Sequence, residues 1–237
     1  MSRILIEKII EFETTIKESP LKQGNSIYTF LNPVSYLTAL KKESLFARFD
    51  GIMVDGAILA TAIRLLYGVK VRRRSFDTTS VASSLFRYAI SKNKSVYIVG
   101  AKQEQVERSV EILKEQYPEL QIVGYRNGYF SSKKEMEEEC KNIISMNPAF
   151  VIVGMGTPNQ ELFLSQLKQA GYKGIGFTCG AFISQLSMKG IKYYPVWADK
   201  YNLRFLYRIY KEKHTRKRYL KAAFLFPICF VWNNLRK

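Results

Sequence analysis

Short apolar segments that alternate with longer periodic segments constrain the fold of this chain more than any other feature. The apolar segments have the length of strands, and most intervening segments have the apolar spacing of helices. The predicted strands are residues 26–31, 49–54, 95–99, 121–125, 150–153 and 174–178, and the predicted helices are residues 4–17, 33–42, 57–67, 103–117, 133–146 and 160–169. Such alternation is typical of parallel βαβ units. The sequence therefore predicts an α/β fold of Rossmann-like type, a mostly parallel sheet with helices on both faces.

Composition divides the chain into two parts. It has 237 residues, of which 47% are apolar, enough for one sizeable core. Residues 200–237 hold eleven Lys or Arg against one acid, so ten of the seventeen excess positive charges lie there. We therefore expect an α/β domain over residues 1–192 and a basic, aromatic, helical appendage over residues 193–237. The three cysteines are widely spaced, which favours unpaired thiols in a reducing compartment, and the N-terminus lacks a signal-peptide pattern.

Residues 150–161, Phe-Val-Ile-Val-Gly-Met-Gly-Thr-Pro-Asn-Gln-Glu, predict a buried strand that turns through glycines into a helix. Gly154 and Gly156 permit a tight turn, and Pro158 fits the first turn of a helix. The N–H groups and positive dipole end of such a helix can bind a phosphate group. Asn159 stands where the dinucleotide fingerprint needs its third glycine, which disfavours nicotinamide cofactors. The alternative is that the glycines only shape a compact turn.

Polar residues occur at the ends of the first two predicted strands. Asn32 is either the cap of the helix that Pro33 opens or a residue at a ligand site. Asp55 is either the cap of the helix at residues 57–67 or a carboxylate at the mouth of a cleft, or both. Open parallel sheets bind ligands at the carboxyl ends of their strands. Thr29, Asn32 and Asp55 are therefore candidate site residues.

Basic residues form two groups, and each group has more than one interpretation. Arg72, Arg73 and Arg74 form a turn that is either a solvated loop or, beside a phosphate site, a means of neutralising a diphosphate. In the tail, basic and aromatic residues interleave before eleven uncharged residues, 222–232, which are too few to span a bilayer. We expect residues 200–237 to bind an anionic membrane surface. The alternatives are a helix packed on the core with a solvated basic face, and nucleic-acid binding.

Several stretches, in order and spacing, resemble the WecG/TagA/CpsF glycosyltransferases, bacterial enzymes that extend polyprenyl-diphosphate-linked sugars for teichoic acid, capsule or related polymers. The matching stretches are Thr29-Phe-Leu-Asn32, Asp55-Gly56 with the helix after it, the turn from Arg72 to Asp77, Tyr97-Ile-Val-Gly100, Gly128-Tyr129-Phe130, Val153-Gly-Met-Gly-Thr-Pro-Asn-Gln-Glu161, Leu206-Tyr207-Arg208 and Arg218-Tyr219. Departures cluster at residues 183–185, 193–195 and 213–215, so the acceptor sugar and the linkage are not carried over.

The resemblance implies an inverting transfer from a UDP-sugar to a hydroxyl of a polyprenyl-diphosphate-linked sugar. Asp55 then matches the general base, and Thr29 and Asn32 match active-site positions. The donor would bind at Gly154, Gly156, Pro158, Gln160, Glu161, Arg72, Arg74, Arg208 and Arg218, with the appendage closing over the site. Which of Arg72, Arg73 and Arg74 contacts the donor stays open. The enzyme would be cytoplasmic and peripheral on the inner face of the cell membrane. Nucleic acid would not be a partner, and a homo-oligomer stays open.

The chemistry of the residues adds an expectation about metals. One carboxylate suffices to take the acceptor's proton in a single displacement. The four aspartates, Asp50, Asp55, Asp77 and Asp199, form no Asp-x-Asp pair, so we expect cations and the helix start at Pro158 to stabilise the leaving diphosphate without a metal. The other hypothesis is a non-catalytic nucleotide- or nucleic-acid-binding protein, or an activating partner of another transferase.

Overall fold

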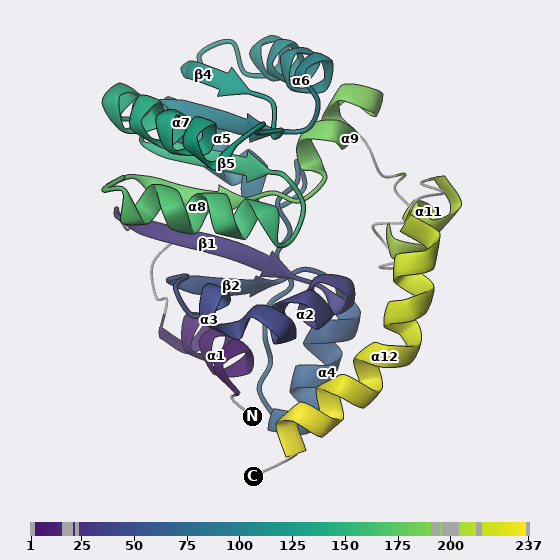
Figure 1. Cartoon of the computed structure of the whole chain (residues 1–237). Helices are drawn as coiled ribbons and strands as arrows, with labels where there is room; N and C mark the ends of the chain where they lie inside the picture. The colour runs from purple at the N-terminus through teal and green to yellow at the C-terminus, as the bar shows by residue number, and fades with distance from the viewer. Residues whose placement is uncertain are drawn as a thin grey trace.

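The computed structural model describes residues 3–15, 21, 24–190, 195, 204–211 and 215–235. Its centre is a six-stranded sheet in the order β2-β1-β6-β5-β3-β4 (Figure 1). The strands are β1 (Ser26–Leu31), β2 (Gly51–Val54), β3 (Val96–Gly100), β4 (Ile122–Arg126), β5 (Phe150–Gly154) and β6 (Ile175–Thr178). Every neighbouring pair in this sheet is parallel. The predicted Rossmann-like α/β class is therefore confirmed.

Helices cover both faces of the sheet. They are α1 (Ile4–Thr15), α2 (Pro33–Ala39), the 3-10 turn η2 (Leu40–Lys42), α3 (Glu43–Phe46), α4 (Ala57–Tyr67), α5 (Val81–Ser91), α6 (Gln103–Gln116), α7 (Lys133–Met146), α8 (Asn159–Gln169), α9 (Phe182–Lys189), α11 (Arg204–Lys211) and α12 (Arg216–Leu235). Paired residues of neighbouring strands point to the same face, so Ile98 and Ile152 pack with α5, α6 and α9. Val99 and Val153, one position further, pack with α7 and α8 on the other face.

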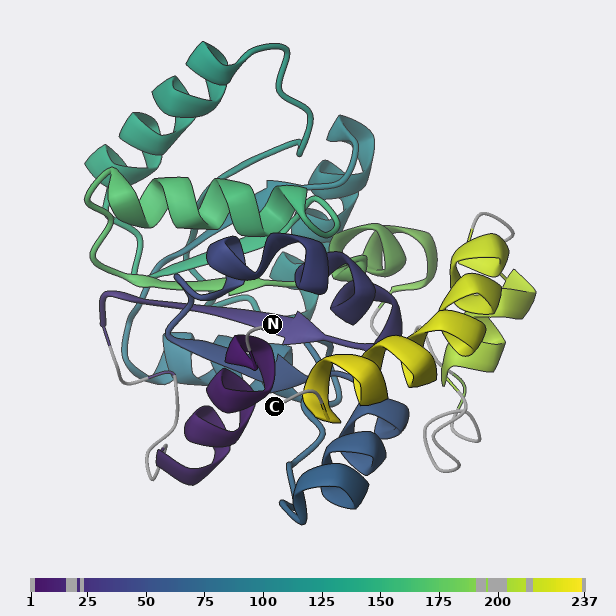
Figure 2. The ribbon, with the colours of Figure 1, turned by 60° about the horizontal axis from the view of Figure 1, so that its bottom comes forward.

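A third buried cluster joins the C-terminal helix to the core. Phe226 and Phe230 of α12 pack on Tyr36 of α2, with ring centroids 5.6 and 5.5 Å from the tyrosine ring. The same cluster includes residues of α1, α4, β1 and β2. Helix α12 continues through Pro227 and lies beside α2 and α4 (Figures 1 and 2). None of the described helices is long and apolar enough to cross a bilayer.

The observed helices differ from the predicted ones in a few places. The helix predicted at residues 33–42 is α2 followed by η2, and the sequence prediction did not include α3, α5 and α9. Helix α5 carries a helical signal that could have identified it, because Ala82, Leu85, Phe86 and Ala89 recur at helical spacing and are buried. Residues 16 and 17 of the first predicted helix lie outside the described residues.

Candidate active site

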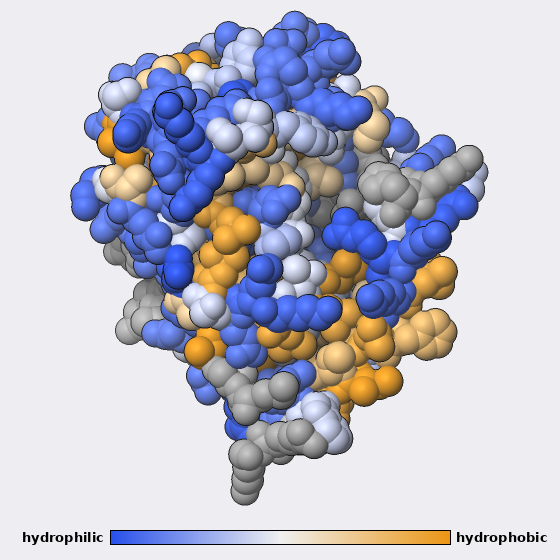
Figure 3. Space-filling view, viewed as in Figure 1, coloured by the Kyte–Doolittle hydropathy of each residue, from blue (hydrophilic) through white to orange (hydrophobic). Residues whose placement is uncertain are grey.

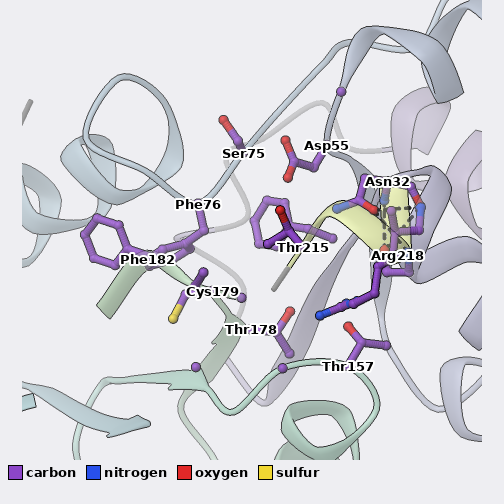
Figure 4. Close-up of a pocket in the computed structure, with 18 of the residues that line it drawn as sticks. Asn32, Asp55, Ser75, Phe76, Thr157, Thr178, Cys179, Phe182, Thr215 and Arg218 are labelled. Carbon is purple, nitrogen blue, oxygen red and sulfur yellow. Dashed lines mark hydrogen bonds between the residues drawn. The ribbon is translucent and has the colours of Figure 1, made fainter. Parts of the chain in front are cut away.

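A cavity of about 880 Å³ lies at the carboxyl ends of the strands. Segments that follow all six strands line it, with Asn32 after β1, Asp55 after β2, Ala101 after β3, Gly128 after β4, Gly156 after β5 and Cys179 after β6. Arg218 of α12 lines the same cavity from the opposite end of the chain, as Figure 4 shows. Parallel sheets bind ligands in this position because the segments that follow their strands meet there.

The glycine turn after β5 forms one wall of the cavity. A Cβ at Gly154 would lie 2.8 Å from Cys179 Sγ, so a larger residue there would displace that side chain, and Gly156 adopts a left-handed conformation with φ of +73°. Both glycines line the cavity. Helix α8 begins at Asn159, so Pro158 stands just before the helix and not in its first turn as the sequence predicted. Thr157 and Asn159 line the cavity, whereas Pro158 does not.

Behind this wall, Glu161 is the centre of a buried hydrogen-bond network. Its Oε1 accepts hydrogen bonds from Thr29 Oγ1 at 2.9 Å, Gln160 Nε2 at 2.9 Å and Thr157 Oγ1 at 3.2 Å. Thr29 Oγ1 also lies 2.8 Å from Thr178 Oγ1. Burial raises the pKa of Glu161 above its ordinary value, and its buried Oε2 has no hydrogen-bond partner among the described residues. Glu161 and Thr29 do not line the cavity, so they support it from behind.

Gln160 connects this network to the cavity. Its Nε2 donates to Glu161, and its Oε1 accepts a hydrogen bond from the backbone N–H of Gly180 at 3.1 Å. Both ends of the amide are therefore held by the protein, which fixes its orientation. Gln160 lines the cavity, as its predicted role in the donor pocket requires.

Asn32 and Asp55 face the cavity from neighbouring strands. Asn32 is the cap of α2, because its Oδ1 accepts hydrogen bonds from the backbone N–H groups of Val34 and Ser35 (Figure 4, dashed lines). The cap interpretation was correct, and the residue also lines the cavity. The cap interpretation of Asp55 was wrong, because Gly56 occupies the cap position of α4. Asp55 is a half-buried carboxylate at the cavity.

The three arginines of the basic turn point to different places. Arg73 forms a parallel bridge with Val54 and lines the cavity. Arg74 forms an ion pair with Glu13 and lies over the ring of Phe12, and neither Arg74 nor the exposed Arg72 lines the cavity. Successive residues of an extended segment point to opposite sides, which explains why Arg73 differs from both neighbours. Of the three arginines between which the sequence left the choice open, Arg73 is therefore the one that lines the cavity, and not Arg72 or Arg74.

The appendage closes one side of the cavity. Thr215 and Arg218 line it, and Figure 4 shows the Arg218 side chain extending toward Thr157 and Thr178. Arg208 belongs to α11, but its side chain and residue His214 lie outside the described part of the chain. Sequence reasoning did not identify Thr215, because nothing in its neighbourhood marks it as facing a cavity. Only the packing of α12 on the core brings this end of the chain to the strand ends.

Neutral polar residues that were not candidates line the cavity near α6 and α9. They are Gln105, Tyr129, Ser184 and Gln185. Ser184 and Gln185 lie in residues 183–185, one of the places where the sequence departs from the family that it resembles. Among the described residues, no group of three or more His, Cys, Asp or Glu side chains could hold a metal ion.

Among the described residues, two carboxylates, Asp55 and Asp77, line the cavity together with two arginines and a glycine turn. A Rossmann-like domain with this cavity has the arrangement of an α/β glycosyltransferase. The chain belongs to the Glycosyl transferase WecG/TagA/CpsF family, whose profile matches residues 7–237. The relationship predicted from the sequence is confirmed.

Named relatives agree with this assignment. The UDP-Gal:alpha-D-GlcNAc-diphosphoundecaprenol beta-1,4-galactosyltransferase of Shigella boydii is 33% identical over 216 residues, which cover 91% of this chain and 90% of that enzyme. The N-acetylglucosaminyldiphosphoundecaprenol N-acetyl-beta-D-mannosaminyltransferase of Bacillus subtilis (strain 168) is 26% identical over 199 residues, covering 82% of this chain and 75% of that enzyme. Both relatives are named as transferases that act on undecaprenyl-diphosphate-linked N-acetylglucosamine.

Proposed function

We propose that this protein transfers a sugar from a UDP-sugar to a hydroxyl of a polyprenyl-diphosphate-linked sugar, with inversion at the anomeric carbon. One observation carries the proposal: Asp55, Arg73, Arg218 and the turn at Gly156 line the same cavity. This cavity combines a carboxylate that can take a proton with cations that can stabilise a leaving diphosphate. The names of the relatives support a lipid-linked acceptor, and one of them names UDP-galactose as donor.

On this proposal the reaction is a single displacement. The acceptor hydroxyl attacks the anomeric carbon while its proton passes to the Asp55 carboxylate, and the bond from that carbon to the diphosphate oxygen breaks. The bonding electrons leave with UDP. Attack from the side opposite the leaving group inverts the configuration. A β-linked product, as in the names of both relatives, is consistent with inversion of the α-linked donors that are common among UDP-hexoses.

Charge on the leaving diphosphate would be stabilised by the protein. Arg73, from the segment between α4 and α5, and Arg218 of α12 both line the cavity, and guanidinium groups bind phosphate oxygens through two parallel hydrogen bonds. Asn159 and Gln160, at the start of α8, line the same cavity, and the positive end of a helix dipole favours an anion. We expect these groups to act without a divalent metal. The donor-binding roles given to Gly154, Gly156 and Gln160 fit this placement, whereas Arg73 replaces Arg72 and Arg74 in the proposal.

The proposal also places the enzyme at the membrane surface on which its acceptor would lie. On α12, Phe224, Ile228 and Trp232 recur at intervals of four residues and are 74%, 66% and 54% exposed. Figure 3 shows apolar surface at this end of the molecule beside hydrophilic side chains, and the first turns of α12 carry Arg216, Lys217, Arg218 and Lys221. We call these three residues the apolar stripe. An apolar stripe next to cations is suited to an interfacial helix, with cations on lipid headgroups and aromatic rings at the boundary. Peripheral attachment to the inner face of the cell membrane follows.

Incubating the protein with a panel of UDP-sugars tests this function. UDP release is measured with and without a polyprenyl-diphosphate-linked N-acetylglucosamine, in the presence of EDTA and then of manganese. We expect acceptor-dependent UDP release with one class of sugar, unchanged by EDTA. Absence of release with every donor would contradict the transferase proposal and favour a binding or activating role. Release that requires manganese would contradict the role given to the arginines.

A further inference from the structure

One end of the cavity is apolar and lies between the first turn of α4 and the middle of α12. Ala57 and Ile58 line it from α4, and Leu220, Ala223 and Pro227 line it from α12. None of these five side chains is charged, whereas the charged residues that line the rest of the cavity are Asp55, Asp77, Arg73 and Arg218. We call this part of the cavity the apolar slot.

A hydrogen bond between α4 and α12 fixes how the two helices on either side of the slot lie relative to each other. At the far end of α4, the Tyr67 hydroxyl donates a hydrogen bond to Asn234 Oδ1 of α12 at 2.5 Å. Residues 57–58 of α4 line the cavity with residues 223 and 227 of α12. The two helices therefore run in the same direction side by side, as Figures 1 and 2 also show. The hydrogen bond at the far end of α4 holds the two helices together there, which reduces the ordering that a ligand in the slot would require.

Along α12, the side chains that line the cavity change from charged to apolar. A lipid diphosphate has the same order, with a charged head group followed by a hydrocarbon chain. Arg218 lies at the N-terminal end of the cavity-lining face, and Ala223 and Pro227 follow along the same helix. Nine residues of helix separate Arg218 from Pro227, a rise of roughly 13 Å. This order suits a lipid whose diphosphate lies in the polar part of the cavity and whose hydrocarbon chain follows the helix. The slot is also open, since Ile58 is 49% exposed and Ala223 and Pro227 are exposed.

We infer that the apolar slot binds the first isoprene units of the acceptor lipid, between Ile58 of α4 and Ala223 and Pro227 of α12. This inference rests on the proposed function for the identity of the acceptor. The slot holds the chain that follows the diphosphate, while the sugar at the other end of the diphosphate lies toward Asp55. The enzyme then recognises the lipid through the cavity itself and not only through attachment of α12 to the membrane.

Binding of two soluble diphosphates, without vesicles, tests the inference independently of sugar transfer. Farnesyl diphosphate and methyl diphosphate carry the same head group but differ in chain. We expect the protein to bind farnesyl diphosphate at least tenfold more tightly, because burial of each methylene adds to affinity. Ala223→Trp should fill the slot, and Ile58→Asn should make it polar. Each variant should reduce the preference for farnesyl diphosphate to about threefold or less.

Leu65→Asn is the matched control, because Leu65 lies on α4 and is 82% exposed but does not line the cavity. It should keep the full preference for farnesyl diphosphate. No preference in the wild-type protein, or a preference that survives both slot variants, would overturn the inference. Ala223→Trp should also bind anionic vesicles like the wild type, and loss of vesicle binding would place Ala223 on the membrane-facing surface instead. If the preference holds but no UDP-sugar is transferred, the proposed function fails while the lipid slot stands.

Discussion

Asn234 of α12 donates a hydrogen bond from Nδ2 to the Tyr36 hydroxyl of α2 at 3.1 Å, across 198 positions of sequence. The same amide accepts from the Tyr67 hydroxyl of α4. Asn234 is buried, and it therefore fastens the C-terminal end of α12 to both helices that follow the first two strands. Those helices begin next to Asn32 and Asp55. The position of Arg218 at the cavity thus depends on contacts made more than 15 residues further along α12.

Replacing Asn234 tests this fastening. Asn234→Leu removes both inter-helix hydrogen bonds and leaves two tyrosine hydroxyls unpaired. We expect a loss of about 2–3 kcal/mol in the free energy of unfolding and faster tryptic cleavage within residues 216–221. The adjacent residue supplies a control, since among the described residues Asn233 donates its side-chain hydrogen bond to Cys229 of its own helix and not to another helix. Equal effects of Asn233→Leu and Asn234→Leu in urea unfolding and proteolysis would show that the contact does not hold α12 in place.

The basic turn permits a similar comparison of neighbouring residues. Arg73→Ala should weaken UDP binding about tenfold or more, because a guanidinium bound to phosphate contributes on the order of 1.5–3 kcal/mol. Arg72→Ala should leave UDP binding within about twofold, because Arg72 is exposed and does not line the cavity. Calorimetric titration of both variants with UDP measures the difference. Equal weakening by the two substitutions would mean that the turn acts through overall charge.

Glu161 gives the stability of the protein a defined pH dependence. Burial raises its pKa in the folded protein above the ordinary value of 4.5. Above that pH, the folded state therefore binds more protons than the unfolded state. The free energy of unfolding consequently falls as the pH rises from 4.5 toward the pKa of Glu161 in the folded protein, and it levels off at higher pH. The fall is about 1.4 kcal/mol for each pH unit between the two pKa values.

Glu161→Gln isolates this contribution. Glutamine keeps an oxygen that can accept from Thr29 and Thr157 but cannot ionise. The difference in unfolding free energy between wild type and Glu161→Gln should move in favour of the variant as pH rises from about 4.5. Urea unfolding of both proteins over a pH series measures this difference. Parallel pH profiles would indicate that Glu161 does not change its protonation on folding.

The apolar stripe of α12 makes a prediction about membranes. Phe224→Asp combined with Ile228→Asp should abolish binding to anionic vesicles, because two carboxylates cannot enter the interface and also oppose the headgroup charge. Val123→Asp combined with Met146→Asp makes the same change of charge at exposed apolar residues of β4 and α7. That control should keep vesicle binding in a sedimentation assay. Retention by the α12 variant would refute attachment through the stripe.

Local chemistry made the strand ends predictable from the sequence. The glycines and the apolar run in residues 150–154 predict a buried strand and a turn, and both Gly154 and Gly156 line the cavity. Asp55 was placed at the end of a strand by the same reasoning. The bridge between Val54 and Arg73 could not be predicted, because it depends on how a loop pairs with a strand edge. The register of the sheet also puts Thr29 behind the cavity, next to Glu161.

Contacts between segments that are distant in the sequence also limited what could be predicted. Arg218 was a candidate from the family resemblance, but Thr215 was not, because its place at the cavity depends on the packing of α12 on α2. Composition predicted a basic, aromatic appendage without indicating which face would be buried. The structure places Phe226 and Phe230 against the core and leaves Phe224 and Ile228 exposed. One face of α12 thus packs on the core while the neighbouring face is exposed to solvent. The amino-acid composition of the segment does not show this difference.

The role of Asp55 is tested most directly by the rate of sugar transfer in Asp55→Asn. Asparagine preserves the shape of the side chain but cannot accept the acceptor's proton. We expect kcat to fall about 10²- to 10⁴-fold while the dissociation constant for UDP stays within about twofold of the wild-type value. Transfer at the wild-type rate by a variant that still binds UDP would show that Asp55 is not the base and would contradict the proposed mechanism.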